Sequence, residues 1–379
     1  MPDHEADLLI TGARVVSGGA VEDGWIRFAA GRVLARGIDA PPPHDGAVLE
    51  ASGRLLTPGF VDIHVHGGGG TDASEGPAAL PALLAAHRAH GTTRTALSLV
   101  SAPVAELVVA LRALAPLVRA DPLLLGVHLE GPFISPDARG AHDPSALTAP
   151  TPEEVAALLD AADGTLAQVT IAPERPGALE AIAALVQGGV RVAVGHTTAD
   201  LATAGAAFDA GASLLTHTFN AMPVLAHREP GPIGAAIERP GVVLELIADG
   251  LHVHPIVIAA LFRLAPGRVA LITDAMAAAG VGDGEYRLGP LDVVVRDGAA
   301  RLTSGSLAGS TLTLDAAIRT AVAAGVPLAE AVRAATETPA RALGRPDLGT
   351  LEVGSPADAV LLTEEYEVDA VWAAGRRLA

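Results

Sequence analysis

The stretch "LTPGFVDIHVHGGGG", residues 56–70, decides how the fold is interpreted. It opens with a Pro-Gly break, continues as a short apolar strand, and ends in His64, His66 and the glycine run 67–70. Side chains two apart in a strand point the same way, so both histidines can converge on one point. They are either metal ligands or polar residues at the start of a loop. The glycines are not a P-loop, because no G-K-[ST] follows them, and we expect them to let the backbone turn tightly.

Composition indicates a globular chain. Its 379 residues suit one large domain with a smaller one, and 50 % of them are hydrophobic, which excludes disorder as the main state. The mean hydropathy is +0.40, yet no run approaches the ~20 apolar residues that a spanning helix needs. The acidic start MPDHEAD lacks the basic residues and apolar run of a secretory signal. We therefore expect a cytoplasmic protein with no membrane partner.

Absent residue types and net charge exclude several chemistries. Cysteine and lysine are both missing, so thiolate metal sites, disulfides, Schiff bases and a carbamylated lysine between two metals are excluded. The formal net charge of −18 argues against a nucleic-acid partner, because phosphate backbones require a basic surface. A small anionic substrate remains compatible if a few arginines focus the field locally.

From residue 58 onward, β-rich runs alternate with Ala/Leu-rich helical runs. Eight such alternations predict a (β/α)₈ TIM barrel rather than a doubly wound sheet, whose G-x-G-x-x-G turn is missing after the first strand. A hairpin with an Asp-Gly turn is expected at 293–302, after the eighth strand. The strands are expected at 59–63, 92–98, 123–129, 166–171, 190–194, 212–216, 242–247 and 268–273.

The two chain ends both look like β-structure, and ADLLI near the start resembles ADAVLL near the end. We expect residues 1–57 and 346–379 to form one small β-sandwich domain around an inserted catalytic barrel, 58–345. Gly12, Gly31 and Gly53 are expected in turns between its strands.

Polar side chains fall where the barrel strands end, which is where barrel active sites lie. Glu130, His196 and His217 would supply three metal ligands from three strands. His64 and His66 would add enough ligands for a second ion. Asp274, at the end of the eighth strand, would then exchange protons with water and a leaving group. His128, Glu174 and Asp249 occupy similar positions without an assigned role in catalysis.

Each of these residues also has an ordinary structural interpretation. A lone H-x-H motif is weak evidence for metal ligands, a lone aspartate often caps a helix, and a lone glutamate is usually solvated. The order His-x-His, Glu, His, His, Asp over five of the eight strands is far harder to obtain by accident. The combination therefore predicts a metal-dependent hydrolase.

These residues resemble the amidohydrolase superfamily and, within it, the N-acetylglucosamine-6-phosphate deacetylase family. The resemblance covers essentially the whole chain. It rests on PGFVDIHVHGGGG, GVHLEGPFISPDARGAH, VAVGHTTA, LTHTFNAM, ADGLHV, LITDAM and SGSLAGS. Other branches often place a carbamylated lysine between two metals, whereas this family places a glutamate there, and Glu130 in HLEGPF matches it.

The resemblance implies a role for each matching residue. Glu130, His196 and His217 would bind the principal metal, with His64 and His66 available for a second. Asp274 would be the catalytic acid/base, and His142 would hydrogen-bond the developing oxyanion. The residues implied to bind the amide, sugar and phosphate are Ala141, His142, Asn220, Ala221, Arg228, His252, Leu307, Ala308 and Gly309. Arg228 suits phosphate because a guanidinium is a planar fork of donors.

The resemblance implies hydrolysis of N-acetylglucosamine 6-phosphate to glucosamine 6-phosphate and acetate. The cofactor would be one or two divalent ions per subunit, zinc before iron, manganese, cobalt or nickel. A homodimer is implied, in which Arg228 and His252 would reach a neighbouring phosphate pocket. Two alternatives remain: deacetylation of a related sugar phosphate such as N-acetylgalactosamine 6-phosphate, and a barrel that serves only as a scaffold.

Overall fold

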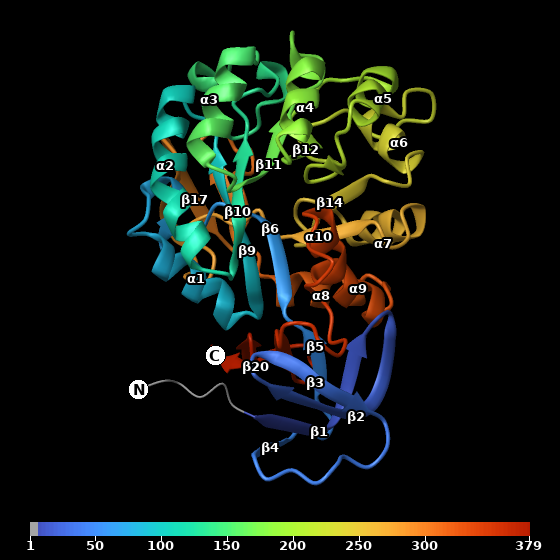
Figure 1. Cartoon of the computed structure of the whole chain (residues 1–379). Helices are drawn as coiled ribbons and strands as arrows, with labels where there is room; N and C mark the ends of the chain where they lie inside the picture. The colour runs from blue at the N-terminus through green and yellow to red at the C-terminus, as the bar shows by residue number, and fades with distance from the viewer. Residues whose placement is uncertain (1–6) are drawn as a thin grey trace.

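The computed structural model describes residues 7–379. Residues 1–6 lie outside the described residues. They make up most of the acidic start MPDHEAD, from which we predicted that a secretory signal is absent. Figure 1 shows a barrel surrounded by helices, with the blue N-terminal and red C-terminal strands side by side beneath it. Both chain ends therefore contribute to one separate sheet, as the sequence predicted.

Eight parallel strands form the barrel, and each overlaps the range predicted for it. In chain order they are β6 (Phe60–Val65), β9 (Thr92–Val100), β10 (Leu124–Glu130), β11 (Leu166–Ile171), β12 (Arg191–Val194), β13 (Leu214–Leu215), β14 (Val243–Ile247) and β15 (Val269–Ile272). The first and last strands meet where Asp274 N donates to His64 O at 2.9 Å. The predicted (β/α)₈ fold is confirmed.

Helices cover the outside of the barrel (Figure 1). They are α1 (Leu80–Ala89), α2 (Val104–Ala120), α3 (Pro152–Ala162), α4 (Ala178–Gln187), α5 (Leu201–Asp209), α6 (Gly231–Ile237), α7 (Pro255–Leu264), α8 (Leu314–Ala323), α9 (Leu328–Ala335) and α10 (Glu337–Ala342), with short 3₁₀ turns at Ala73–Glu75, Pro136–Ala138 and Pro144–Ala146. A capping box begins α3, since Thr151 Oγ1 accepts from Glu154 N and Glu154 Oε2 accepts from Thr151 N, both at 3.2 Å. Within residues 7–379, no helix has the length and apolarity to cross a membrane.

The glycine run forms a tight hairpin of β7 (Gly67–Gly68) and β8 (Thr71–Asp72). Gly69 and Gly70 have φ of 61° and 85°, a conformation that glycine adopts without strain. A Cβ on Gly67 would lie 2.6 Å from Ala277 N. The run therefore serves close backbone packing after the first barrel strand, as expected.

The small domain is one sheet with its own core. Its strands are β1 (Leu8–Ser17), β2 (Ala20–Ala29), β3 (Arg32–Gly37), β4 (Ala47–Glu50), β5 (Leu55–Pro58), β19 (Ala359–Leu362), β20 (Val368–Ala373) and β21 (Arg376–Arg377). The sheet folds back on itself where Val33 N donates to Ser355 O at 2.9 Å. Phe28 and Trp372 meet across the enclosed core with ring centroids 6.5 Å apart.

Two sequence expectations bear on this domain. Gly12 was expected in a turn, but it lies inside β1, at a break in the β1–β2 register, with φ of 68°. The expectation was wrong because a glycine in a strand marks a bulge as readily as a turn. The boundaries at 57/58 and 345/346 stay a prediction, since one apolar cluster runs from Val16 and Leu55 into the barrel.

A third sheet is inserted after the eighth barrel strand. It consists of β16 (Gly284–Leu288), β17 (Leu291–Arg296) and β18 (Ala299–Leu302). Asp297 and Gly298 form the two-residue turn between β17 and β18, with φ of 51° and 73°. The Asp-Gly hairpin is confirmed, and the additional strand β16 brings Leu288 to the wall of the site described next.

Candidate active site

A cavity of about 190 Å³ lies at the carboxyl ends of the barrel strands. Its walls contain most of the residues that the sequence predicted, together with three that it did not: Gly140, Ile247 and Leu288. The lining residues are His66, Glu130, Gly140, Ala141, His142, His196, His217, Asn220, Ala221, Ile247, His252, Asp274, Leu288, Leu307 and Gly309.

Three predicted residues do not line this cavity. His64 is fully buried beneath it, Ala308 is fully buried between Leu307 and Gly309, and Arg228 lies in an exposed loop. Arg228 Nη1 contacts only the neighbouring His227 Nε2, at 2.9 Å, among described partners. The family resemblance implied a role for Arg228 at the phosphate but could not say which way its loop faces.

Backbone conformation aims several side chains into the site. His196, His217 and Asp274 are each the second residue after their strands, and their φ values are 45°, 23° and 49°. Such left-handed backbone costs of order 1–3 kcal/mol in a residue other than glycine and persists only where its surroundings impose it. It occurs here where a turn at the strand end directs a side chain inward.

Glu130, His196 and His217 form one group of ligand atoms. Glu130 Oε1 lies 3.2 Å from His196 Nε2 and 3.1 Å from His217 Nε2. The two Nε2 atoms are 2.9 Å apart. Strands β10, β12 and β13 thus bring together the three residues predicted to bind the principal metal.

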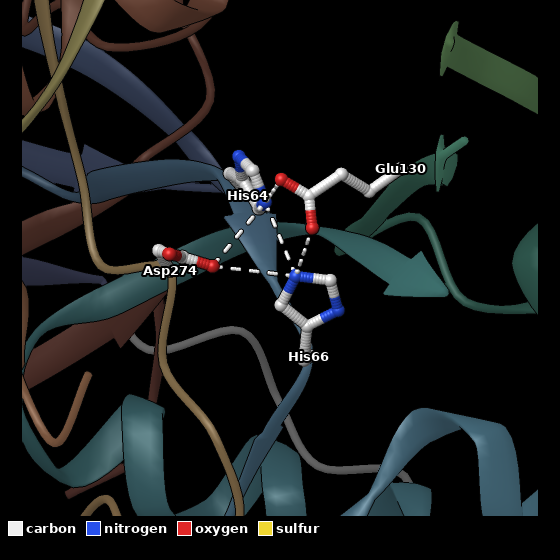
Figure 2. Close-up of side chains that lie close together, drawn as sticks. All are labelled: His64, His66, Glu130 and Asp274. Carbon is white, nitrogen blue, oxygen red and sulfur yellow. Dashed lines mark hydrogen bonds and ion pairs between the residues drawn. The ribbon is translucent and has the colours of Figure 1, made fainter. Parts of the chain in front are cut away.

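A second group shares Glu130 and adds His64, His66 and Asp274 (Figure 2). His64 Nε2 is 3.3 Å from Glu130 Oε1, and His66 Nε2 is 3.1 Å from Glu130 Oε2. Asp274 Oδ1 lies 3.4 Å from His64 Nε2 and 3.3 Å from His66 Nε2. The single carboxylate of Glu130 therefore faces both groups.

Contacts on the far side of each ring indicate which nitrogen carries hydrogen. His196 Nδ1 lies 2.9 Å from Ala138 O, which can only accept, so Nδ1 donates and Nε2 presents a lone pair to Glu130. His142 is the reverse: Ser101 N–H donates to His142 Nδ1 at 3.2 Å. His142 Nε2 therefore carries hydrogen and faces Glu130 Oε2 at 3.3 Å. His196 suits a metal, and His142 suits a carbonyl oxygen.

The residues present fit a divalent cation. Imidazole nitrogens and carboxylate oxygens are the ligands that zinc and similar ions take. The second group holds its ligand atoms within 4.8 Å of one another, and the first holds them within 3.2 Å. Among the described residues no lysine or arginine lines the cavity, so the negative charge of the Glu130 and Asp274 carboxylates is left for protons on the imidazoles or for a bound cation to offset.

Electrostatics agree with this arrangement. Burial opposes the charge of Glu130, yet the surrounding imidazoles hold its pKa well below the ordinary value, so it is ionised. Burial lowers the pKa of His142 to about 4, although Glu130 opposes the shift, so the ring is neutral. Burial also opposes a positive charge on His252, but its 2.6 Å hydrogen bond to Asp249 raises the His252 pKa above the ordinary value. His252 is therefore a cationic candidate in the cavity wall, paired with Asp249 rather than with Glu130 or Asp274.

Two further polar residues at strand ends have structural partners instead. His128 lies between the hydroxyls of Ser98 and Thr170, 2.9 Å from each. Glu174 accepts from Thr198 N at 2.6 Å. Neither lines the cavity.

One buried polar residue near the site was missed by the sequence analysis. Glu245 in β14 has no exposed surface, and its Oε2 lies 3.2 Å from His64 Nδ1. The available signal was an acidic residue inside the apolar run VVLELIA.

Fold and site together define a class of protein. Residues 55–378 match the amidohydrolase family, and the chain belongs to that family. Its relatives include an N-acetylgalactosamine-6-phosphate deacetylase from Escherichia coli O157:H7, 41 % identical over 94 % of this chain and 96 % of the relative. An N-acetylglucosamine-6-phosphate deacetylase from Vibrio furnissii is 38 % identical over 85 % of this chain and 82 % of the relative.

Solved structures of similar proteins agree. A mutant N-acetyl-D-glucosamine-6-phosphate deacetylase from Mycobacterium smegmatis, in complex with N-acetyl-D-glucosamine-6-phosphate, is 45 % identical. It superposes with a TM-score of 0.95 and covers 99 % of this chain and 100 % of its own. The chain is thus similar to N-acetyl amino-sugar phosphate deacetylases along nearly its entire length.

Proposed function

We propose that this protein is an amide hydrolase that converts N-acetylglucosamine 6-phosphate and water to glucosamine 6-phosphate and acetate. The observation that carries the proposal is Glu130 facing two groups of imidazole nitrogens beside the neutral donor His142. The Mycobacterium smegmatis relative, 45 % identical and bound to that sugar phosphate, supports the substrate.

Glu130, His196 and His217 would hold the principal metal, with His64 and His66 completing a second position beside Asp274. Zinc suits a nitrogen-rich donor set best, while iron, manganese, cobalt and nickel are the alternatives. When bound, a divalent ion supplies Lewis acidity, which polarises a carbonyl and lowers the pKa of water from 15.7 towards ~7.

The chain's own residues would handle the protons. Asp274 lies in the cavity wall and would take a proton from the attacking water as the C–O bond forms. The Nε2–H of His142 would donate to the developing oxyanion, and its orientation is already set by Ser101. As the C–N bond breaks, Asp274 would return the proton to the departing amine. Ala141, Asn220, Ala221, Leu307 and Gly309 would position the sugar.

Phosphate recognition would require a second copy of the chain. Within residues 7–379 no arginine lines the cavity, which contains the carboxylates of Glu130 and Asp274, so an anionic phosphate needs charge beyond that of His252. Arg228 lies outside on the loop whose Val224 is 72 % exposed, and Ile256 in the first turn of α7 is 74 % exposed. Such exposed apolar residues suit an interface. A homodimer would bury them and bring Arg228 to the partner's cavity.

We place the enzyme in the cytoplasm and divide it into the small β-domain, 1–57 with 346–379, and the barrel, 58–345. β5 ends at Pro58 in the small sheet and β6 begins at Phe60 in the barrel, which supports the first boundary.

A second substrate is favoured by one specific observation. The Escherichia coli relative, 41 % identical, is an N-acetylgalactosamine-6-phosphate deacetylase. The two sugars differ at a hydroxyl remote from the amide, so the site chemistry described above serves either. A comparison of kcat/KM for the two sugar phosphates decides between them.

The central test is acetate release from N-acetylglucosamine 6-phosphate, with and without a chelator. We expect turnover that the chelator removes and added zinc restores. If no divalent ion supports acetate release from either sugar phosphate while the protein binds metal normally, the deacetylase proposal is wrong and a scaffold role is favoured.

A further inference from the structure

The interior of the barrel beneath the site holds a buried carboxylate that the proposed chemistry does not use. Glu245 is the central residue of β14 and has no exposed surface. Barrel interiors are ordinarily filled by branched apolar side chains, and a carboxylate out of contact with water costs several kcal/mol unless it is paired. Such a residue requires an explanation from its contacts.

Each of the three described partners of this carboxylate can donate a hydrogen bond to it. Its Oε1 accepts from Gln168 Nε2 at 2.7 Å. Its Oε2 lies 3.2 Å from His64 Nδ1 and accepts from His217 N at 3.4 Å. Glu245 thus contacts one residue from each of the two ligand groups, and it does so from the side facing away from the cavity.

The contact with His64 determines what that ring presents to the site. A carboxylate that accepts from Nδ1–H leaves the lone pair of His64 Nε2 free, and it increases the basicity of that nitrogen. His64 Nε2 is the atom 3.2 Å from His66 Nε2 and 3.3 Å from Glu130 Oε1. His66 has no such support, because its Nδ1 is buried without a described partner.

Gln168 in turn holds the carboxylate. It lies in β11, which is separated from β14 by β12 and β13 in the sheet, so the 2.7 Å contact runs across the barrel interior. The Oε1 atom of Gln168 has no described partner. Its described side-chain hydrogen bond is therefore the one to Glu245.

We propose that Glu245 is a positioning residue that holds His64 as a ligand for a second divalent ion, with Gln168 orienting Glu245. The proposal rests on the metal-dependent function proposed above. It adds to that function a second ion in each chain and the residues that orient one of its ligands. Glu245 does not line the cavity, and it contacts the ring of His64 but only the backbone N–H of His217, so it orients a ligand ring at the second position.

The test is a titration of metal-free protein with Zn²⁺ against a chromophoric chelator, which yields the stoichiometry and both dissociation constants. We expect two ions per wild-type chain. Glu245→Gln preserves shape and should raise the dissociation constant of the weaker ion about 10–100-fold while leaving the tighter one unchanged. Manganese-loaded wild-type protein should show the EPR signal of a coupled ion pair, which Glu245→Gln loses.

Two further variants keep the result interpretable. Gln168→Leu should weaken the second ion less than Glu245→Gln, and it provides the test if the latter does not fold. Asp358→Asn is the matched control, since Asp358 is a buried carboxylate that accepts from Arg94 Nε at 2.6 Å, away from the site. It should lower the melting temperature and leave both constants unchanged.

Three outcomes would overturn the proposal: one ion per wild-type chain, an unchanged second constant in Glu245→Gln and Gln168→Leu, or an equal rise in both constants. Acetate release by wild type is measured in parallel. A selective loss of the second ion in a protein that hydrolyses neither sugar phosphate would reject the proposed function and leave this inference standing.

Discussion

The backbone N–H of Ser101 donates to Nδ1 of His142 at 3.2 Å, which leaves the hydrogen of that neutral ring on Nε2. His142 otherwise lies close enough to Glu130 and His196 to be a third ligand. The Ser101 contact argues against that role, because a nitrogen that carries hydrogen has no lone pair for a metal. Two histidines with rings 4.6 Å apart, His142 and His196, are thereby given opposite functions.

His142→Ala should lower kcat by roughly 10²–10³, the cost of removing one oxyanion donor, while metal content is retained. Steady-state kinetics and elemental analysis of the same preparation measure both quantities. A preparation that loses one ion per chain would show that His142 is a ligand after all.

Asp274→Asn should lower kcat by about 10²–10⁴, because the carboxamide neither accepts nor returns the proton. Its metal content and its KM should change little. Asp249→Asn is the matched control: Asp249 bonds His252 rather than the reacting atoms, so its loss should raise KM instead. Near wild-type turnover in Asp274→Asn would remove Asp274 from the mechanism.

Metal removal should lower stability as well as activity. An ion that binds only the folded chain stabilises it by about 2.7 kcal/mol at one hundred times its dissociation constant. Calorimetry of chelated protein should therefore show a lower Tm that rises with added Zn²⁺. A Tm that is the same with and without zinc would show that the two ligand groups hold no ion in the folded protein.

Stability should fall in acid through Asp315, which is buried and bonded to His90 and to Arg319 Nη1, the latter at 3.0 Å. Burial opposes its charge, but these partners and Thr313 hold the pKa of Asp315 at about 2, below the ordinary 3.8. A lowered folded pKa contributes stability that is complete above pH 4 and is lost as the pH falls from about 4 to about 2.

Asp315→Asn should accordingly lower the free energy of unfolding by about 2 kcal/mol at pH 7. Denaturant unfolding at pH 7, 4 and 2.5 measures this, and the difference from wild type should shrink below pH 4. A difference that is constant across this range would assign the loss to packing rather than to charge.

Arg228→Ala should raise KM about 10–100-fold with little change in kcat, as expected for one charge-assisted bond to phosphate. If Arg228 serves the partner's cavity, mixing Arg228→Ala with Asp274→Asn chains should restore low-KM turnover. In the mixed dimer, one cavity has both an intact Asp274 and a partner that supplies Arg228. Mixed subunits that retain the high KM would show that Arg228 does not serve the partner's cavity, and an unchanged KM in Arg228→Ala itself would place Arg228 outside phosphate recognition.

The sequence by itself determined the barrel and the chemical character of the site. Eight apolar runs separated by helical periodicity specify strands, and parallel strands bring their carboxyl ends to one rim. Polar residues at those ends, such as Glu130, His196 and Asp274, were therefore recognisable before their distances were known. The Asp297-Gly298 turn and the α3 capping box were equally visible, because both depend on residues a few positions apart.

Only the tertiary structure decided which histidine is a ligand, which is a donor, and which predicted residues lie outside the cavity. The proton on His196 depends on Ala138 O, that on His142 on Ser101 N, and the lone pair of His64 on Glu245. Glu245 stands 181 positions from His64 in the chain. A hydrogen bond is made at about 3 Å between atoms whose separation along the chain carries no information, so these assignments exist only once the barrel has closed.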